Sequence, residues 1–121
     1  MGKFKVLKTA KGHVFHLIAG NGEIIGTSQS YASKNGCKNG IESVRSNATA
    51  ASIEDQTEKE SVPNPKFEIY QDRKKQFRFR LRALNGKEIL SSEGYSEKKQ
   101  CKQGIASVRK NAPGAKLIDE E

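Results

Sequence analysis

Apolar and polar residues alternate over three short stretches near the start of the chain. The first stretch contains Phe4 and Val6. The second contains Phe15 and Leu17, and the third spans residues 23–28. An alternation with a period of two is typical of strands that bury one face. The chain is therefore predicted to begin with three strands.

A helical spacing follows the third predicted strand. Apolar residues recur at steps of four, three and four positions, and they are Cys37, Ile41, Val44 and Ala48. Residues at such steps share one face of a helix. Ser33 is the expected N-cap, and Asn47 with the following alanine is the expected stop signal. Residues 51–53 form a short apolar segment, so the unit is predicted to be β-β-β-α-β.

The whole pattern occurs twice. Positions 15–51 align with positions 79–115 at an offset of 64, and 19 of the 37 aligned pairs are identical. A nine-residue motif, Gly-Ile-x-Ser-Val-Arg-x-Asn-Ala, begins at Gly40 and again at Gly104. In the second unit Ser96 is the expected N-cap, and the stop signal begins at the asparagine of the motif.

Each unit has too small a core to be expected to fold stably on its own. It supplies roughly ten core side chains, and at ~1.5–3 kcal/mol for each large one their burial hardly exceeds the ordering entropy of the unit. We therefore expect one merged domain, a monomer with internal pseudo-twofold symmetry. Its parts would be a first repeat at 1–53, a second repeat at 66–118, and an exposed, acidic, proline-containing linker at 54–65.

The hairpin between the second and third strands leaves two registers open. Asn-Gly occurs at this place in both units and is a strong turn signal. A two-residue loop would pair Leu17 with Gly26, whereas a three-residue loop with a glycine bulge would pair Leu17 with Ile25. Only the second choice, which also pairs Leu81 with Ile89, buries a large apolar residue in both units. The three-residue loop is therefore favoured.

These motifs resemble the YegP-like family of small bacterial proteins in its duplicated form. The resemblance rests on Phe-x-Leu-x-Ala-x-Asn-Gly from Phe15, on Tyr31 and Tyr95, and on the two nine-residue motifs, and it covers residues 3–118. It implies an α+β fold, with one antiparallel sheet, both helices on one face and the C-terminal strands exchanged between repeats. It also implies that one-repeat members pair as dimers. It brings no established activity, substrate or cofactor.

Charge and composition limit the kinds of partner and the cellular location that we expect for this protein. The net charge is +8, with +5 in the first repeat, −3 in the linker and +6 from residue 66 onward. A basic surface admits nucleic acid or acidic partners. The two cysteines, the lack of a long apolar run and the lack of a hydrophobic N-terminal segment predict a cytoplasmic protein that does not contact membranes.

Catalytic and metal-binding chemistry has no support in the sequence. Cys37 and Cys101 occupy core-facing helix positions. His13 and His16 point to opposite sides of a strand and have no histidine counterparts in the second unit. We expect no enzyme activity, no metal and no cofactor.

The repeated motif is expected to be structural. Its small and polar members are Gly40, Ser43 and Asn47 with Gly104, Ser107 and Asn111. A glycine within a helix costs ~1 kcal/mol relative to alanine, so it indicates a close approach of another group. The alternative is a stretch of exposed backbone that contacts a ligand.

The sheet face away from the helices is where the repeats differ most. The second repeat presents a cationic set with one aromatic, namely Arg78, Arg80, Arg82, Lys66 and Tyr70. The first presents an apolar set, namely Val14, Ile18 and Ile24. We expect a module that binds a macromolecular partner, either protein or nucleic acid, through this face. The alternative is nucleic-acid or polyanion binding by the arginine ladder.

Overall fold

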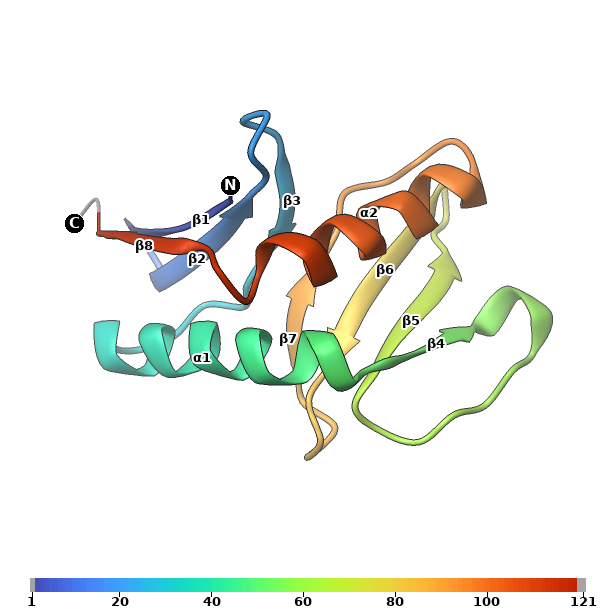
Figure 1. The fold of residues 1–121 in the computed structure, drawn as a ribbon, viewed down its shortest axis with the longest axis horizontal. Coiled ribbons are helices and arrows are strands. Elements are labelled where there is room, and N and C mark those ends of the chain that lie inside the picture. The colour runs from blue at the N-terminus through green and yellow to red at the C-terminus, as the bar shows by residue number, and fades with distance from the viewer. Residues whose placement is uncertain (1, 120–121) are drawn as a thin grey trace.

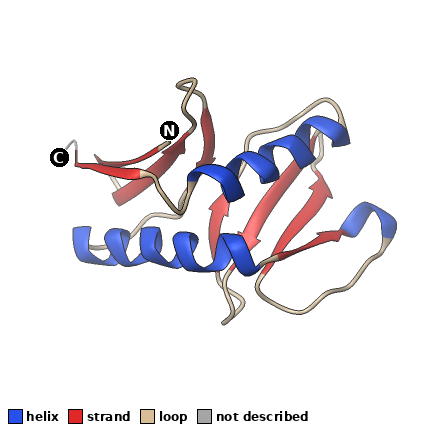
Figure 2. Cartoon of the chain, in the orientation of Figure 1, coloured by secondary structure: helices blue, strands red, loops and turns tan. Residues whose placement is uncertain are grey.

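The structure, a computed structural model, describes residues 2–119 and contains one eight-stranded sheet with two α-helices on the same face (Figures 1 and 2). The first repeat comprises β1 (Lys3–Thr9), β2 (Gly12–Ile18), β3 (Ile24–Thr27), α1 (Lys34–Ala50) and β4 (Ser52–Asp55). The second comprises β5 (Lys66–Gln71), β6 (Phe77–Arg82), β7 (Glu88–Ser91), α2 (Lys98–Asn111) and β8 (Lys116–Asp119). The predicted α+β fold and the order of elements in each repeat are confirmed.

The last strand of each repeat lies in the half of the sheet that the other repeat forms. The strand order is β4-β5-β6-β7-β3-β2-β1-β8 (Figure 1). The two halves join where Thr27 of β3 lies opposite Ser91 of β7. The expected strand exchange is therefore confirmed. The sheet is mixed and not wholly antiparallel, because β4 and β8 each follow a helix that crosses the sheet and run parallel to β5 and β1.

The hairpin loop has the predicted length, but the predicted register is wrong. The Gly22 N–H donates to the Ala19 carbonyl at 2.9 Å, and Gly22 has a φ of 89°, as a three-residue loop with a left-handed glycine requires. Leu17 nevertheless lies opposite Gly26 and not opposite Ile25. A β-bulge at Ile25 inserts one extra residue into β3 and shifts the pairing.

The second repeat shows why this bulge is present. Leu81 lies opposite Leu90 and not opposite Ile89, so the same shift occurs there. Ile89 is 5% exposed and Leu90 is 1% exposed, and a bulge allows two successive apolar residues to be buried together. In the first repeat Gly26 occupies the equivalent place, and a Cβ added to it would lie 2.6 Å from Leu90 Cγ. Glycine therefore leaves the space that Leu90 fills where the halves join.

The helix faces were predicted more accurately than the helix ends. All the core-facing positions inferred from the helical spacing are buried, and these are Cys37, Ile41, Val44, Ala48, Cys101, Ile105, Val108 and Ala112. Ser33 caps α1 by accepting the Gly36 N–H at 3.0 Å, as expected. The N-cap of α2 is Glu97, which forms a capping box with Gln100, so the prediction of Ser96 is wrong by one residue.

The predicted stop signals mark only one of the two helix ends. Helix α2 ends at Asn111, but α1 continues past Asn47 to Ala50. The two ends differ because Pro113 and Gly114 follow α2, whereas Thr49 and Ala50 at the aligned positions continue α1. Both asparagines donate back to the carbonyl four residues earlier, that of Ser43 or Ser107, at 2.8 Å. Such a bond leaves the helical backbone hydrogen bonds in place.

The segment between the repeats is only partly exposed. Strand β4 takes in Glu54 and Asp55, the first two residues of the predicted linker, and both are buried. Asp55 Oδ2 forms an ion pair with Lys98 Nζ of α2 at 2.8 Å. A 3₁₀ helix, Gln56–Glu58, follows. The acidic residues of this segment therefore help to attach it to the second repeat.

Candidate functional site

The sheet face opposite the helices has two chemically different halves, and we call it the open face. Alternation along each strand directs every second side chain to it. In the first-repeat half, Ile24, Ile18, Lys3 and Lys116 form one row across β3, β2, β1 and β8. Two isoleucines therefore lie directly beside two lysines.

The predicted docking residues all lie on this half, but only two of them are adjacent. Ile24 is 42% exposed, and Ile18 beside it is 8% exposed. Val14 lies near the other end of β2, half-buried opposite Leu7. His16 lies between them on the same strand, and burial lowers the pKa of its imidazole, which favours the neutral ring. The strip along β2 is therefore mainly uncharged at neutral pH.

The predicted arginine ladder lies on the other half and is paired with carboxylates. Arg82 Nε lies 2.8 Å from Glu68 Oε1, and Arg80 donates to the same oxygen. Arg78 Nε lies 2.7 Å from Asp72 Oδ2. All three arginines therefore hold acidic side chains of their own repeat.

Lys66, the predicted fourth cation, lies inside this network. Its Nζ is 2.8 Å from Glu54 Oε1 and 3.3 Å from Glu68 Oε2. Burial alone would raise the pKa of Glu54, but hydrogen bonds from Lys66, from the Val62 N–H and from Gln56 lower it to about 2. The pKa of Glu68 is also lowered, since its bonds to the arginines and Lys66 outweigh its burial. These charges connect β4 to β5 and β6.

Tyr70 lies beside Arg80, whose Cζ is 4.2 Å from the centroid of the Tyr70 ring. The adjoining β5–β6 turn carries three consecutive basic residues that the sequence analysis did not single out, namely Arg73, Lys74 and Lys75. A hollow of about 360 Å³ is lined by Tyr70, Asp72, Arg78 and the first two of these basic residues. The run of three basic residues within a turn was the signal that would have found them.

The glycines of the repeated motif leave room for the two repeated tyrosines. A Cβ added to Gly104 would lie 2.7 Å from Tyr95 Oη and 3.0 Å from Phe79 Cε2. Gly40 lies against Tyr31 in the same way. Real Cβ atoms do not approach other atoms so closely, so a larger residue at either place would have to displace the tyrosine.

The asparagines of the motif bond back to their own helices, and Asn47 also holds its helix to a neighbouring loop. Asn47 and Asn111 each donate to the carbonyl four residues earlier, Ser43 and Ser107, at 2.8 Å. Asn47 Oδ1 also accepts the backbone N–H of Leu84 at 3.2 Å, which attaches α1 to the β6–β7 loop.

The arginine of each motif reaches the opposite repeat. Arg109 donates to the carbonyl of Ala51, where α1 leads into β4, and its Cζ lies 5.3 Å from the Phe67 ring centroid. Arg45 makes the corresponding contact with the Pro113 carbonyl at 3.3 Å. These arginines therefore hold the exchanged strands at the points where they leave the helices.

The remaining candidate chemistry is sparse. Residues 2–119 contain no group of three or more His, Cys, Asp or Glu side chains placed to hold a metal ion. Burial raises the pKa of the Cys101 thiol to about 11, so this thiol stays protonated at neutral pH. In the same range, no helix combines the length and apolarity that a membrane span requires.

Comparison with known proteins places the chain in a family. A family model described as a domain of unknown function (DUF1508) matches residues 9–55 and again residues 72–119. The chain belongs to this family. The two matches fall on the two repeats, and they confirm the tandem YegP-like form that the motifs indicated.

The relatives include proteins about as long as one repeat and proteins about as long as both repeats. The UPF0339 protein YegP of Yersinia pestis is 38% identical over 120 residues, which cover 98% of this chain and 96% of the relative. A UPF0339 protein of Treponema denticola is 54% identical over 54 residues, which cover 45% of this chain and 93% of the relative. The second relative therefore corresponds in length to one repeat.

A solved structure confirms the fold. The solution NMR structure of yegP from E. coli, described as a protein of unknown function, superposes with a TM-score of 0.80 at 35% identity. The match covers 98% of this chain and 92% of that one. The names of these three proteins state no activity, substrate or partner.

Proposed function

We propose that this protein is a non-enzymatic binding module that docks a protein partner on the first-repeat half of its open face. The observation that supports this proposal is the exposure of Ile24, at 42%, in a row that ends in Lys3 and Lys116. Both α-helices lie on the other face of the sheet (Figure 1). An exposed apolar residue in the same row as two lysines suits a partner that presents an apolar side chain with carboxylates nearby.

The apolar character of this half is not a requirement of the fold. The second repeat has charged residues at the positions equivalent to Val14, Ile18 and Ile24, and they are Arg78, Arg82 and Glu88. Both sets lie on strands with the same pairing, so the same backbone accommodates either chemistry. An apolar set on an open sheet face is thus a property of this repeat alone, which favours a role in binding.

Site-specific photo-crosslinking in cells tests the proposal. A benzophenone amino acid at Val14 should give a discrete crosslinked protein band, and Ile24→Glu should remove it. Ser46, an exposed residue of α1 on the helix side, is the matched control position. Docking on this face would be contradicted if positions 14 and 46 gave the same crosslinked bands, or if the bands remained in the Ile24→Glu variant. The crosslinked partner peptide is expected to contain acidic residues.

A second candidate is polyanion binding at the Tyr70 end of the open face. The hollow there combines Tyr70 with Arg73 and Lys74, which are exposed, whereas the ladder residues Arg78, Arg80 and Arg82 already bind carboxylates. A nucleic-acid backbone would contact the two exposed cations and stack a base near Tyr70.

Anisotropy of a labelled single-stranded oligonucleotide separates this candidate from the first. Binding through these cations should weaken steeply as salt rises, and Arg73→Ser with Lys74→Ser should remove most of it. Serine at all three ladder positions tests the ladder alone. An affinity that neither set of substitutions lowers would exclude polyanion binding at this end of the sheet.

A further inference from the structure

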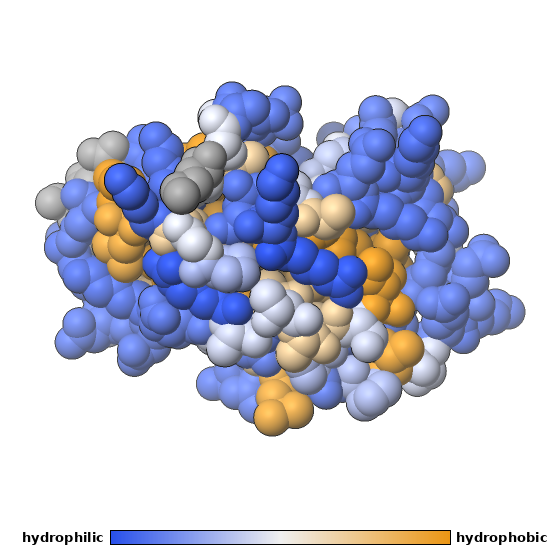
Figure 3. Space-filling view, viewed as in Figure 1, coloured by the Kyte–Doolittle hydropathy of each residue, from blue (hydrophilic) through white to orange (hydrophobic). Residues whose placement is uncertain are grey.

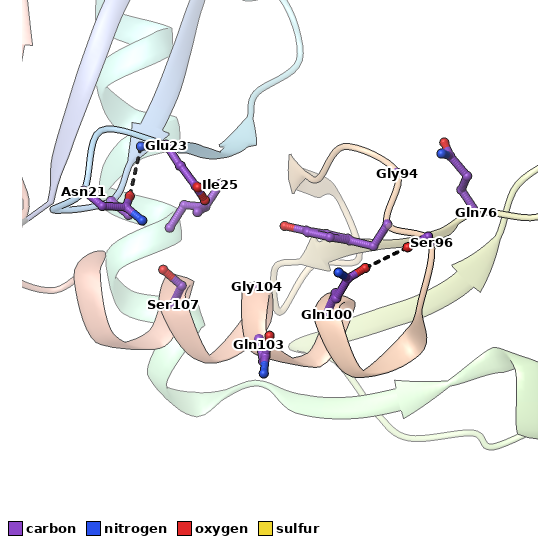
Figure 4. A pocket seen from close by; sticks show the side chains of 12 residues that line it. Asn21, Glu23, Ile25, Gln76, Gly94, Ser96, Gln100, Gln103, Gly104 and Ser107 are labelled. Carbon is purple, nitrogen blue, oxygen red and sulfur yellow. Dashed lines mark hydrogen bonds between the residues drawn. The ribbon is translucent and has the colours of Figure 1, made fainter.

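A groove on the helix side lies between α2 and the β2–β3 hairpin. Its volume is about 560 Å³. Figure 4 shows Asn21, Glu23 and Ile25 on the hairpin wall, with Ser107 and Gly104 on the helix opposite. Tyr95 also lines the groove, with its hydroxyl against Gly104. The groove is on the opposite side of the sheet from the open face, so it is independent of the function proposed above.

Hydrophilic residues cover most of the helix side of the molecule (Figure 3). Ile25 is an apolar member of the groove lining and is 6% exposed. Ala19, which precedes the hairpin loop, adds a second small apolar surface. The groove therefore offers a short apolar wall inside a polar surface.

The framework of the groove occurs in both repeats, but its charge does not. Tyr95, Gly104 and Ser107 have identical counterparts in the first repeat, which are Tyr31, Gly40 and Ser43. Glu23, in contrast, aligns with Lys87, and Gln100 aligns with Gly36. A carboxylate therefore borders one tyrosine, whereas the equivalent position in the other repeat carries a cation. This occurs in a chain whose net charge is +8.

Tyr95 is suited to contact a cation. Among the described residues, no protein group forms a hydrogen bond with its hydroxyl. Burial raises the pKa of this phenol, and the charges of Cys101, Glu93 and Glu23 add to the effect. The phenol stays neutral at physiological pH, and its oxygen lone pairs and ring face can both attract an ammonium group.

We propose that this groove binds a primary alkylammonium group. The ammonium would lie between the Glu23 carboxylate and the Tyr95 ring, and the aliphatic stem would lie along Ile25 and Ala19. A lysine side chain of a protein and a free alkyl diamine share this chemistry.

Amide shifts in two-dimensional NMR, measured during titration with n-butylammonium chloride, test the proposal. The shifts should saturate and be confined to the groove, including the amides of Glu23 and Gly104. Glu23→Gln should weaken binding about fivefold, the value expected when one exposed ion pair is lost. Glu23→Lys should abolish binding. Both substitutions are at an exposed hairpin position, so the fold is retained.

The pseudo-symmetry supplies a gain-of-function control. Lys87 is also exposed, and Lys87→Glu should create a second set of saturable shifts around Gly40 and Tyr31. n-Butanol has the same stem without the charge and should produce no saturable shifts. Equal shifts with n-butanol, an unchanged affinity in Glu23→Gln, or shifts that spread over all the exposed carboxylates would overturn the proposal.

Two further titrations distinguish the sources of the ammonium group. Nα-acetyl-lysine methylamide stands for a lysine side chain, and 1,5-diaminopentane stands for a free diamine. Tighter binding of the lysine derivative assigns the groove to a protein segment, and tighter binding of the diamine assigns it to a small molecule. Failure of both to compete with n-butylammonium contradicts the assignment of the groove.

Discussion

Replacing Glu54 by glutamine should remove most of the stability that this buried carboxylate contributes. Glu54 is 3% exposed and accepts hydrogen bonds from Lys66, Gln56 and the Val62 N–H. Although burial opposes ionisation, these bonds lower its pKa from 4.5 to about 2. At about 1.4 kcal/mol per pKa unit, the shift corresponds to roughly 3 kcal/mol. We expect a loss of about 2 kcal/mol at pH 7, because Lys66 keeps Glu68 as a second partner.

The pH dependence has a definite sign. The pKa of Glu54 is lower in the folded protein than in the unfolded chain, so the unfolded chain binds this proton first as the pH falls. The contribution is present above pH 4.5 and is lost as the pH falls from 4.5 towards 2. The difference in stability between the wild type and Glu54→Gln should therefore become smaller across this window.

Urea unfolding followed by far-UV circular dichroism measures both effects. Glu58→Gln is the matched control, because the Glu58 side chain is 67% exposed and lies 3.8 Å from Lys98. Loss of such an exposed pair should change the free energy of unfolding by less than about 1 kcal/mol. A difference between wild type and Glu54→Gln that stays constant down to the lowest pH at which both fold would refute the reasoning. A control as destabilising as Glu54→Gln would also refute it.

The remaining predictions concern contacts of the repeated motif and the cooperativity of the fold. Gly104→Ala gains about 1 kcal/mol of helix propensity but forces its Cβ against Tyr95, at an overpacking cost of about 1–3 kcal/mol. Urea unfolding should show a net loss, and Tyr95→Phe should recover part of it. Arg109→Met should lower stability by about 1–2 kcal/mol, because it loses the bond to the Ala51 carbonyl and the stacking on Phe67. Because the repeats share one sheet, heating should give one cooperative transition, and two separate transitions would contradict the merged domain.

The helices were predictable because the same helical spacing of apolar residues occurs in both repeats. The strand exchange, in contrast, was expected only from the resemblance to the YegP-like family. The spacing of Ile41 and Val44 with their neighbours indicates a single buried helix face, and all of those positions are buried. The register of the hairpin was not predictable from alternation alone, because a bulge changes the period within a strand. The signal for the bulge was present in the adjacent pair Ile89 and Leu90, which breaks the alternation.

The pairing of the open-face charges was less accessible to sequence reasoning. Alternation places Glu68 on the same face as the arginines, but only the register shows that it lies opposite Arg80 and within reach of Arg82. Glu54 and Asp55 have the composition of an exposed linker, yet both are buried. Both are buried because they contact Lys66 and α2, which lie further along the chain. The sequence around Glu54 and Asp55 gives no indication of these partners.

Duplication within one chain explains why the differences between repeats are the best guide to function. In a dimer of identical one-repeat chains, each residue occurs in both halves of the sheet and must suit both. Joining the halves removes this constraint, so Ile18 can lie on one half of the open face while Arg82 lies on the other.

The contacts of the repeated motif have not diverged in this way. Each repeat keeps the glycine that faces a tyrosine, the asparagine that donates to the carbonyl four residues earlier, and the arginine that reaches the other repeat. These contacts account for the nine-residue motif without a ligand. Binding is therefore best sought where the repeats differ, at Ile24 on the open face and at Glu23 beside α2. Glu23 and Ile24 are consecutive in the sequence but face opposite sides of the sheet, so a substitution at one should leave the function of the other intact.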